Sequence, residues 1–187
     1  MFRPLSRRTL RWRPVAGEGL EHLTVEPTAS GVSVRSVVIG ERGGSPYGLV
    51  WQISCDPQWR VRQLRLRETG GRTLALDGDG EGRWKSAEGT PLPALDGCVD
   101  IDLAGSPFTN TLPIRRLGLQ PQDGTADLRM VYVPFDSFEP MVDGQRYTCL
   151  LPGQLYRYQA TDRSFSADLP VDEDGFVTDY PTLFVRV

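Results

Sequence analysis

The sequence predicts an all-β protein: a single, strongly curved antiparallel sheet in barrel, half-barrel or rolled form, with little helix. Gly (20 residues) and Pro (15) together supply 35 of the 187 residues, and both weaken helix interiors. Only two stretches free of both, 58–69 and 154–169, reach 12 residues. Apolar and polar residues alternate with a period of two, the pattern of a half-buried strand.

This alternation recurs along the whole chain. The clearest strands are predicted over 32–38, 47–55, 58–69, 99–103, 128–133, 154–169 and 182–186. Turn-forming residues separate them at 43–46, 77–82, 122–124, 142–144 and 151–153. About 11 to 14 short strands with local connections predict an antiparallel sheet. A sheet of that size must curl, split or close.

Composition excludes several classes of protein. The chain is 39% hydrophobic and 24% charged, unlike a disordered protein. No run of 18 apolar residues occurs, so the chain is not expected to span a membrane. No apolar signal segment follows Met1, and the three scattered cysteines are expected to be reduced, so we expect a cytoplasmic protein. Its length predicts one domain over 1–187.

The net charge of the chain and its supply of metal-binding side chains limit the classes of partner that we expect. The net charge is −3 and the pI about 5.2, which argues against nucleic acid. One His and three Cys cannot build a histidine-based or four-cysteine zinc site, and we expect no metal or cofactor. The sequence leaves the oligomeric state open.

The segment 58–67 contains four arginines between apolar residues. The apolar residues before and after Gln63 have opposite parity, so a β-bulge near Gln63 would bring them to one face. Arg60 and Arg62 would then lie on the other face. That face is either solvated or an anion-facing ladder for phosphate or sulfate headgroups. A nucleic-acid surface is the weakest alternative in an acidic chain.

The segment 95–118 concentrates polar side chains. Asp100 and Asp102 share one strand face, and Arg115 and Arg116 follow on a segment expected to return as a strand. Between them lie Phe108, Thr109, Asn110 and Thr111. These groups form either a structural ion-pair and hydrogen-bond network or a ligand headgroup site. An acid/base pair or a calcium site built on the two aspartates is a further alternative.

Aromatic residues lie on many of the predicted strands and beside turns, and they include Trp51, Trp59 and Trp84. Ordinary core packing accounts for such residues. Alternatively, several line a concave apolar cavity that takes an acyl chain or a sugar face.

The run Ser106-Pro-Phe-Thr-Asn-Thr-Leu-Pro-Ile-Arg-Arg-Leu117, after Leu95-Asp-Gly-Cys-Val-Asp-Ile-Asp-Leu103, resembles a bacterial family named for glycolipid binding. Further matching pieces are Trp12, Val50-Trp51-Gln-Ile-Ser54 with Asp56, Trp59-Arg-Val-Arg62, Gly82-Arg-Trp84 and Asp179-Tyr-Pro-Thr-Leu-Phe-Val-Arg186. The resemblance covers nearly the whole chain. It implies a curved, partly open sheet, similar to periplasmic lipoprotein carriers, that cradles a lipid; the expected lack of a signal peptide departs from those carriers.

We therefore expect a binding protein for an amphiphilic small molecule, with a glycolipid as the ligand that the resemblance implies. The headgroup would meet Arg60, Arg62, Asp100, Asp102, Thr109, Asn110, Thr111, Arg115 and Arg116, and aromatic walls with Trp51, Trp59, Trp84 and Phe108 would hold the tail. Binding is favoured over catalysis, and no catalytic residue is assigned. The alternatives are an enzyme on carbohydrate or a lipid-linked sugar using Asp100 or Asp102 as acid/base, and a structural or protein-interaction module.

Overall fold

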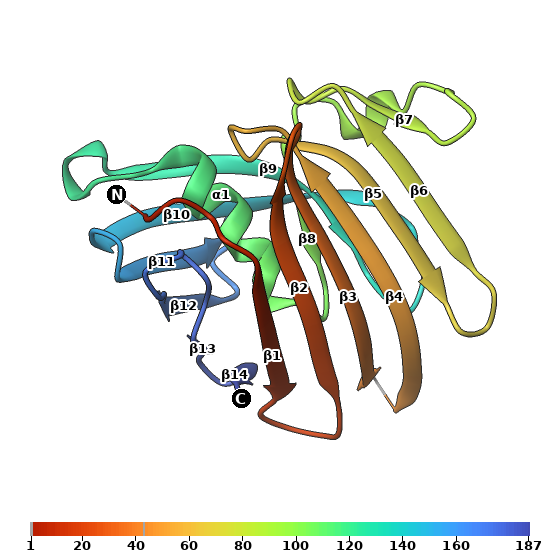
Figure 1. Cartoon of the computed structure of the whole chain (residues 1–187), viewed down its shortest axis with the longest axis horizontal. Helices are drawn as coiled ribbons and strands as arrows, with labels where there is room; N and C mark the ends of the chain where they lie inside the picture. The colour runs from red at the N-terminus through yellow and green to blue at the C-terminus, as the bar shows by residue number, and fades with distance from the viewer. Residues whose placement is uncertain (1, 43) are drawn as a thin grey trace.

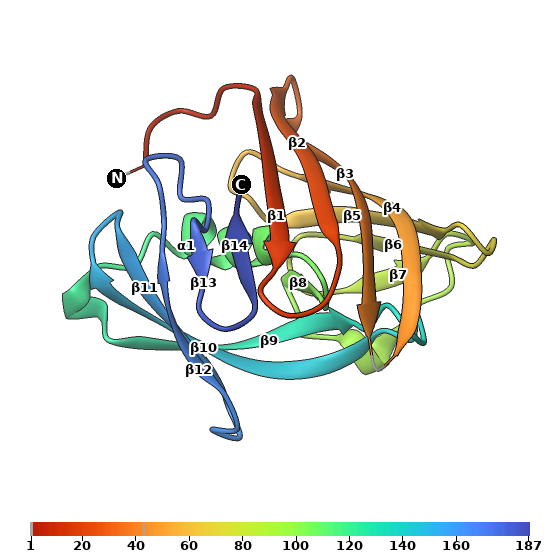
Figure 2. The same cartoon turned by 90° about the horizontal axis from the view of Figure 1, so that it is seen from below.

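The computed structural model describes residues 2–42 and 44–187, and it confirms the all-β class. Fourteen strands lie within these residues, and they divide between two sheets that face each other (Figures 1 and 2). The predicted turn at 43–46 lies partly outside the described residues, because it includes Gly43.

Nine strands form the large sheet, in the spatial order β13-β14-β1-β2-β3-β4-β5-β6-β7. All its neighbouring strands are antiparallel. Their bounds are β1 Arg8–Pro14, β2 Leu20–Thr28, β3 Gly31–Arg42, β4 Ser45–Cys55, β5 Val61–Glu68, β6 Thr73–Gly78, β7 Trp84–Ser86, β13 Asp179–Tyr180 and β14 Phe184–Arg186.

Five strands form the small sheet, in the order β12-β11-β10-β9-β8. They are β8 Asp100–Leu103, β9 Thr125–Val133, β10 Met141–Leu151, β11 Leu155–Ala160 and β12 Ser166–Pro170. The pair β8–β9 is parallel, unlike the all-antiparallel arrangement that we expected. A parallel pair requires a crossover, and residues 104–124 supply it.

The crossover contains the one α-helix of the described residues, α1 Thr111–Leu117, preceded by the 3₁₀ turn η2 Pro107–Asn110. Short 3₁₀ turns also occur at η1 Pro93–Leu95 and η3 Pro121–Asp123. The prediction of a returning strand at Arg115–Arg116 was therefore wrong. Pro113 falls in the first helical turn, where a missing N–H costs no intrahelical bond. Gly118 ends the helix in the left-handed conformation, with φ +58°.

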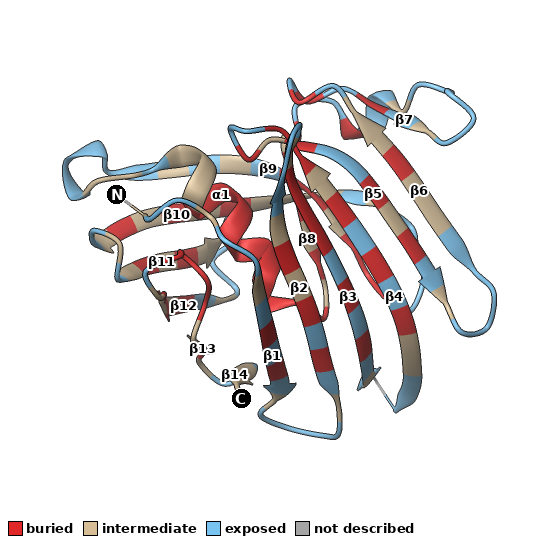
Figure 3. Cartoon of the chain, in the orientation of Figure 1, coloured by how far each residue is buried: buried red, intermediate tan, exposed pale blue. Residues whose placement is uncertain are grey.

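The crossover fills the space between the sheets (Figures 2 and 3). Phe108 and Leu112 are fully buried, and the Phe108 ring lies 6.1 Å from that of Trp51, which projects from β4. Trp84 is also in the core, where its Nε1 donates to the Cys98 carbonyl oxygen at 2.7 Å. The centre of the molecule is thus occupied by its own side chains, and open space lies toward its edges.

The expected bulge in the arginine-rich strand is present at Arg62. Ser54 pairs with Gln63, whereas Cys55 pairs with Val61, so Arg62 is the extra residue. The bulge brings Val61 and Leu64 to the same, buried face despite their opposite parity.

Candidate functional site

Asp100 lies in a buried ion pair with Arg116. Its side chain is buried, and its carboxylate accepts hydrogen bonds from Arg116 Nε at 3.1 Å and Nη2 at 2.5 Å. Burial raises the pKa of Asp100, while the Arg116 guanidinium acts in the opposite direction. The predicted ion pair between these segments exists, and it fastens α1 to β8. Asp100 lines neither of the two cavities described below, and Arg116 occupies its carboxylate, so it is poorly placed for acid/base work.

Asp102, two residues along the same strand, has no cationic partner among the described residues. Thr109 Oγ1 donates to Asp102 Oδ1 at 3.0 Å, and Gln145 Nε2 donates to Oδ2 at 2.7 Å. Burial raises the pKa of Asp102, and the two neutral hydrogen-bond donors only partly oppose this. This carboxyl lies on the wall of a cavity that is open to solvent and not in a closed ion pair.

A second buried carboxyl, Glu21 on β2, has the same kind of environment. It is 2% exposed, and it accepts hydrogen bonds from the Ser36 and Ser106 hydroxyls, each at 2.9 Å. Burial raises the pKa of Glu21 to about 7. A buried acid with a strongly shifted pKa beside a cavity is a typical feature of functional sites.

One hydrogen-bond chain connects the two acids through the crossover. Ser106 Oγ donates to Glu21, and the Ser106 carbonyl accepts from Thr109 Oγ1 at 2.9 Å, the hydroxyl that also lies against Asp102. Tyr147 extends the chain, because its hydroxyl donates toward Gln145 Oε1 and Asn110 Oδ1. The polar run Ser106–Asn110 therefore holds both carboxyls in fixed positions.

Two lobes lie at the edge where the sheets meet, and together we call them the cleft. The Glu21 lobe has a volume of about 340 Å³, and its wall includes Trp12, Glu21, Tyr47 and Phe135. Gly105 permits this packing, because a Cβ there would lie 2.8 Å from Tyr47 Oη and 2.7 Å from the Phe135 ring.

The Asp102 lobe has a volume of about 400 Å³, with Asp102, Asn110, Asp143 and Tyr158 on its wall. Both lobes also contact Ala104, Tyr132, Leu183 and Phe184. The chain between β13 and β14 thus lies where the two lobes meet. Each lobe has a volume in the range of about 300–1,000 Å³ that is usual for small-molecule sites.

The cleft combines acidic walls with an apolar rim. The Asp102 lobe is lined by three aspartates and by no Arg, Lys or His. The Glu21 lobe has one cation on its wall, Arg42, which donates to the Tyr132 hydroxyl at 3.0 Å. Four of the exposed large apolar side chains of the described residues line the lobes: Leu20, Ile39, Met141 and Leu183.

The predicted headgroup residues do not gather in one place. Arg60 pairs with Asp56 at 2.7 Å and with Glu81, while Arg62 Nε donates to the Gly78 carbonyl at 3.1 Å. Thr111 is buried in α1, and its Oγ1 has no hydrogen-bond partner among the described residues. Of the predicted residues, Asp102 and Asn110 line the cleft, and Thr109 supports it.

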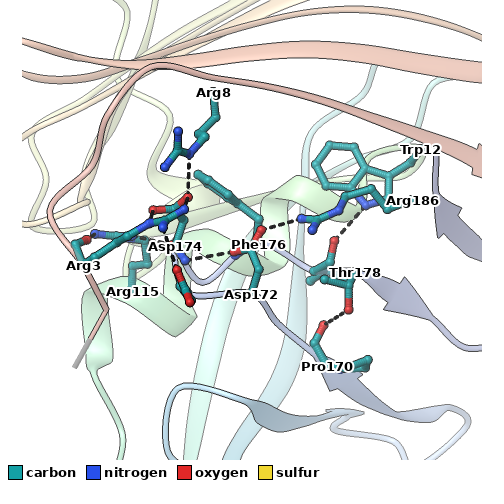
Figure 4. A network of polar contacts seen from close by, with 12 residues as sticks. Arg3, Arg8, Trp12, Arg115, Pro170, Asp172, Asp174, Phe176, Thr178 and Arg186 are labelled. Atoms are coloured by element: carbon teal, nitrogen blue, oxygen red, sulfur yellow. Dashed lines mark hydrogen bonds and ion pairs between the residues drawn. The ribbon is translucent and has the colours of Figure 1, made fainter.

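Arg115 and Trp59 lie elsewhere, beside the N-terminal segment. The Arg115 guanidinium stacks over the Trp59 ring at 4.5 Å and donates to the carbonyl of Asp174. Figure 4 shows that Arg3 and Arg8 also converge on Asp174. The hydrogen bond from Arg3 contributes most to lowering the pKa of Asp174 to about 2. This network fastens the N-terminal segment to the loop before β13.

Glu21 was not among the predicted site residues, although the sequence contains a signal for it. Glu21, Leu23 and Val25 have the same parity, so the alternation places a carboxyl on the apolar face of this strand. An acid at such a position requires partners or a function.

Comparison with known proteins identifies the family. Residues 9–186 match the family described as "Putative glycolipid-binding". The chain belongs to this family. A solved structure with similar architecture is that of a DUF1089 family protein from Pseudomonas aeruginosa, with 36% identity and a TM-score of 0.79 over 100% of this chain and 95% of that chain. A search of curated proteins gave no match. The predicted family membership is confirmed.

No helix among residues 2–42 and 44–187 has the length and apolarity needed to cross a bilayer.

Proposed function

We propose that this protein binds a glycolipid, with the sugar headgroup in the cleft and the acyl part against its apolar rim. One observation carries the proposal: the buried Glu21 and the half-buried Asp102 lie on the walls of adjoining lobes, and both accept hydrogen bonds from neutral donors. The family description supports the same class of ligand.

The charges of the cleft favour an uncharged, hydroxyl-rich headgroup. Carboxylates accept hydrogen bonds and so match sugar hydroxyls, whereas a phosphate or sulfate would meet aspartates without compensating cations in the Asp102 lobe. Tyr47, Tyr132 and Tyr158 add ring surfaces and hydroxyls suited to an amphipathic ligand. This revises the arginine-based headgroup site expected from the sequence.

The exposed apolar side chains at the rim of the cleft would contact the acyl part of the glycolipid. Ile39 is 55% exposed, Met141 49% and Leu183 39%, and all three border the acidic lobes. Burying such side chains against an acyl chain yields about 25 cal/mol per Å² of apolar surface.

The test is a titration with a diacylglycerol glycoside in mixed micelles, followed by thermal shift and tryptophan fluorescence. At pH 8, above the pKa of Glu21 of about 7, we expect Glu21→Gln and Asp102→Asn to weaken binding about ten-fold or more each, because each removes an acceptor of charge-assisted hydrogen bonds. Asp127→Asn, at an exposed pair with Arg146, is the matched control. Equal affinities of all three variants and the wild type, or no binding of the glycoside, would overturn the proposal.

A further inference from the structure

A second hollow lies on the outer face of the large sheet, away from the cleft. It has a volume of about 570 Å³ and is built by β2 to β6. The register of these strands places its outward side chains in two cross-strand rows. One row is His22, Val37, Val50, Arg67 and Thr73, and the other is Thr24, Arg35, Gln52, Arg65 and Ala75. We call this hollow the outer-face groove.

The floor of the outer-face groove is apolar and open to solvent. Val37 and Val50 are register partners on β3 and β4, and they are 52% and 47% exposed. They are two of the most exposed large apolar side chains of the described residues, and they lie side by side. Adjacent apolar side chains in a hollow supply a contact surface for an apolar ligand.

The charged side chains that line the outer-face groove are all positive. Arg35, Arg65 and Arg67 line the groove, and no Asp or Glu does so. Arg35 pairs with Glu26, and Arg65 is folded back onto Asp77 and two backbone carbonyls. Arg67, directly opposite Val50, pairs with no carboxylate of the described residues. Its guanidinium is therefore the donor available to an incoming anion.

We propose that the outer-face groove binds a single-chain anionic amphiphile of the fatty-acid class. The acyl chain lies over Val37 and Val50, and the carboxylate meets Arg67. A guanidinium binds a carboxylate through two parallel N–H···O bonds, and the valines supply apolar contact for the chain. This ligand differs in charge from the one proposed for the cleft, because the cleft walls are acidic and the groove walls are basic.

A second copy of the chain is a poorer occupant. Packing this face against the same face of another copy would place two Arg67 side chains, neither paired with a carboxylate of the described residues, against one apolar floor. Like charges juxtaposed in this way disfavour association. An anionic amphiphile complements both the apolar floor and the positive rim.

The experiment is a titration of the full chain with dodecanoate, below its micelle concentration and at pH 7.5, by calorimetry and ¹H–¹⁵N spectra. We expect shifts at the amides of β3, β4 and β5. Arg67→Gln should weaken binding about ten-fold, and Val37→Ser with Val50→Ser about five-fold or more. All three positions are exposed, so the variants should fold, and their melting temperatures check this. Dodecyltrimethylammonium, with the same chain and the opposite charge, should bind at least ten-fold more weakly.

The cleft variants Glu21→Gln and Asp102→Asn should bind dodecanoate like the wild type, which separates this proposal from the glycolipid proposal. Three results would overturn it. The first is unchanged dodecanoate affinity in Arg67→Gln, and the second is equal affinity for the cationic amphiphile. The third is a dimer in sedimentation that the Val37→Ser, Val50→Ser variant dissociates, since the groove would then be a subunit interface.

Discussion

Asp100 and Asp102 lie two residues apart on β8, and the structure uses them in opposite ways. Asp100 is closed off from solvent and held by the Arg116 guanidinium. Asp102 faces an open lobe and is held by one hydroxyl and one amide. A buried carboxylate paired with a cation fixes two segments of the chain together. A carboxylate on a cavity wall that has only neutral donors keeps the capacity to accept further hydrogen bonds.

Glu21 belongs with Asp102. It comes from a different sheet, yet it contacts the same crossover segment and also accepts hydrogen bonds from uncharged donors. The comparison therefore separates one acid that is paired with a cation from two acids that have only neutral hydrogen-bond donors.

The largest effect is expected from Asp100→Asn. This change leaves the mostly buried Arg116, 17% exposed, without its countercharge, and breaking such a pair costs about 3–5 kcal/mol. For a chain of this size that corresponds to a decrease in melting temperature of roughly 10 °C, measurable by calorimetry. Asp127→Asn, at a pair whose acid is 64% exposed, is the control and should change stability by less than about 1 kcal/mol. Equal losses of stability in the two variants would contradict the distinction between the buried Asp100–Arg116 pair and an exposed ion pair.

Glu21 should make the protein less stable as pH rises. Its pKa is about 7 in the fold and 4.5 in the unfolded chain. Between these values the unfolded state has lost its proton while the folded state retains it. The unfolded state then binds fewer protons, so stability falls with increasing pH, by about 3 kcal/mol in total.

Denaturant unfolding of wild type and Glu21→Gln between pH 4.5 and 7.5 measures this effect. The free energy of unfolding of the variant should lack this decrease with pH, so the variant should become more stable relative to the wild type as pH rises. Glu41→Gln, an exposed acid of the same lobe, should keep the wild-type profile. Parallel profiles for wild type and Glu21→Gln would contradict the assignment of a protonated carboxyl at the cleft.

Asp102→Asn should affect stability far less than Asp100→Asn. The amide keeps an acceptor for Thr109 but faces the Gln145 donor with its NH2 group, and no cation loses its partner, so the expected loss is about 1–2 kcal/mol. Thermal unfolding of both variants at one pH compares them directly. A loss as large as that of Asp100→Asn would class Asp102 as structural.

Thr111→Val should have the smallest effect. The Thr111 hydroxyl is buried without a partner, and an apolar group of similar shape removes an unsatisfied polar atom. We expect a change between zero and a gain of about 1 kcal/mol. Thr109→Val, which removes a hydroxyl bonded to Asp102 and Ser106, is the matched variant and should destabilise the protein.

Local patterns accounted for much of the architecture. The spacing of Gly and Pro, and the period-two alternation, predicted the strands of 32–38, 47–55 and 128–133, and the change of parity around Gln63 predicted the bulge found at Arg62. Such features depend on neighbours in the chain. The helix at 111–117 escaped prediction because a seven-residue helix with an internal proline is stabilised mainly by burial between two sheets.

The sequence by itself determined the all-β class, the family and the presence of a dense polar segment at 95–118. Only the tertiary structure decided what those polar groups do. It assigned Arg116 to Asp100, left Asp102 with neutral donors, and brought Glu21 from 85 residues away to Ser106. The physical reason is that the state of a buried carboxyl depends on desolvation and on the charges that long-range folding places around it.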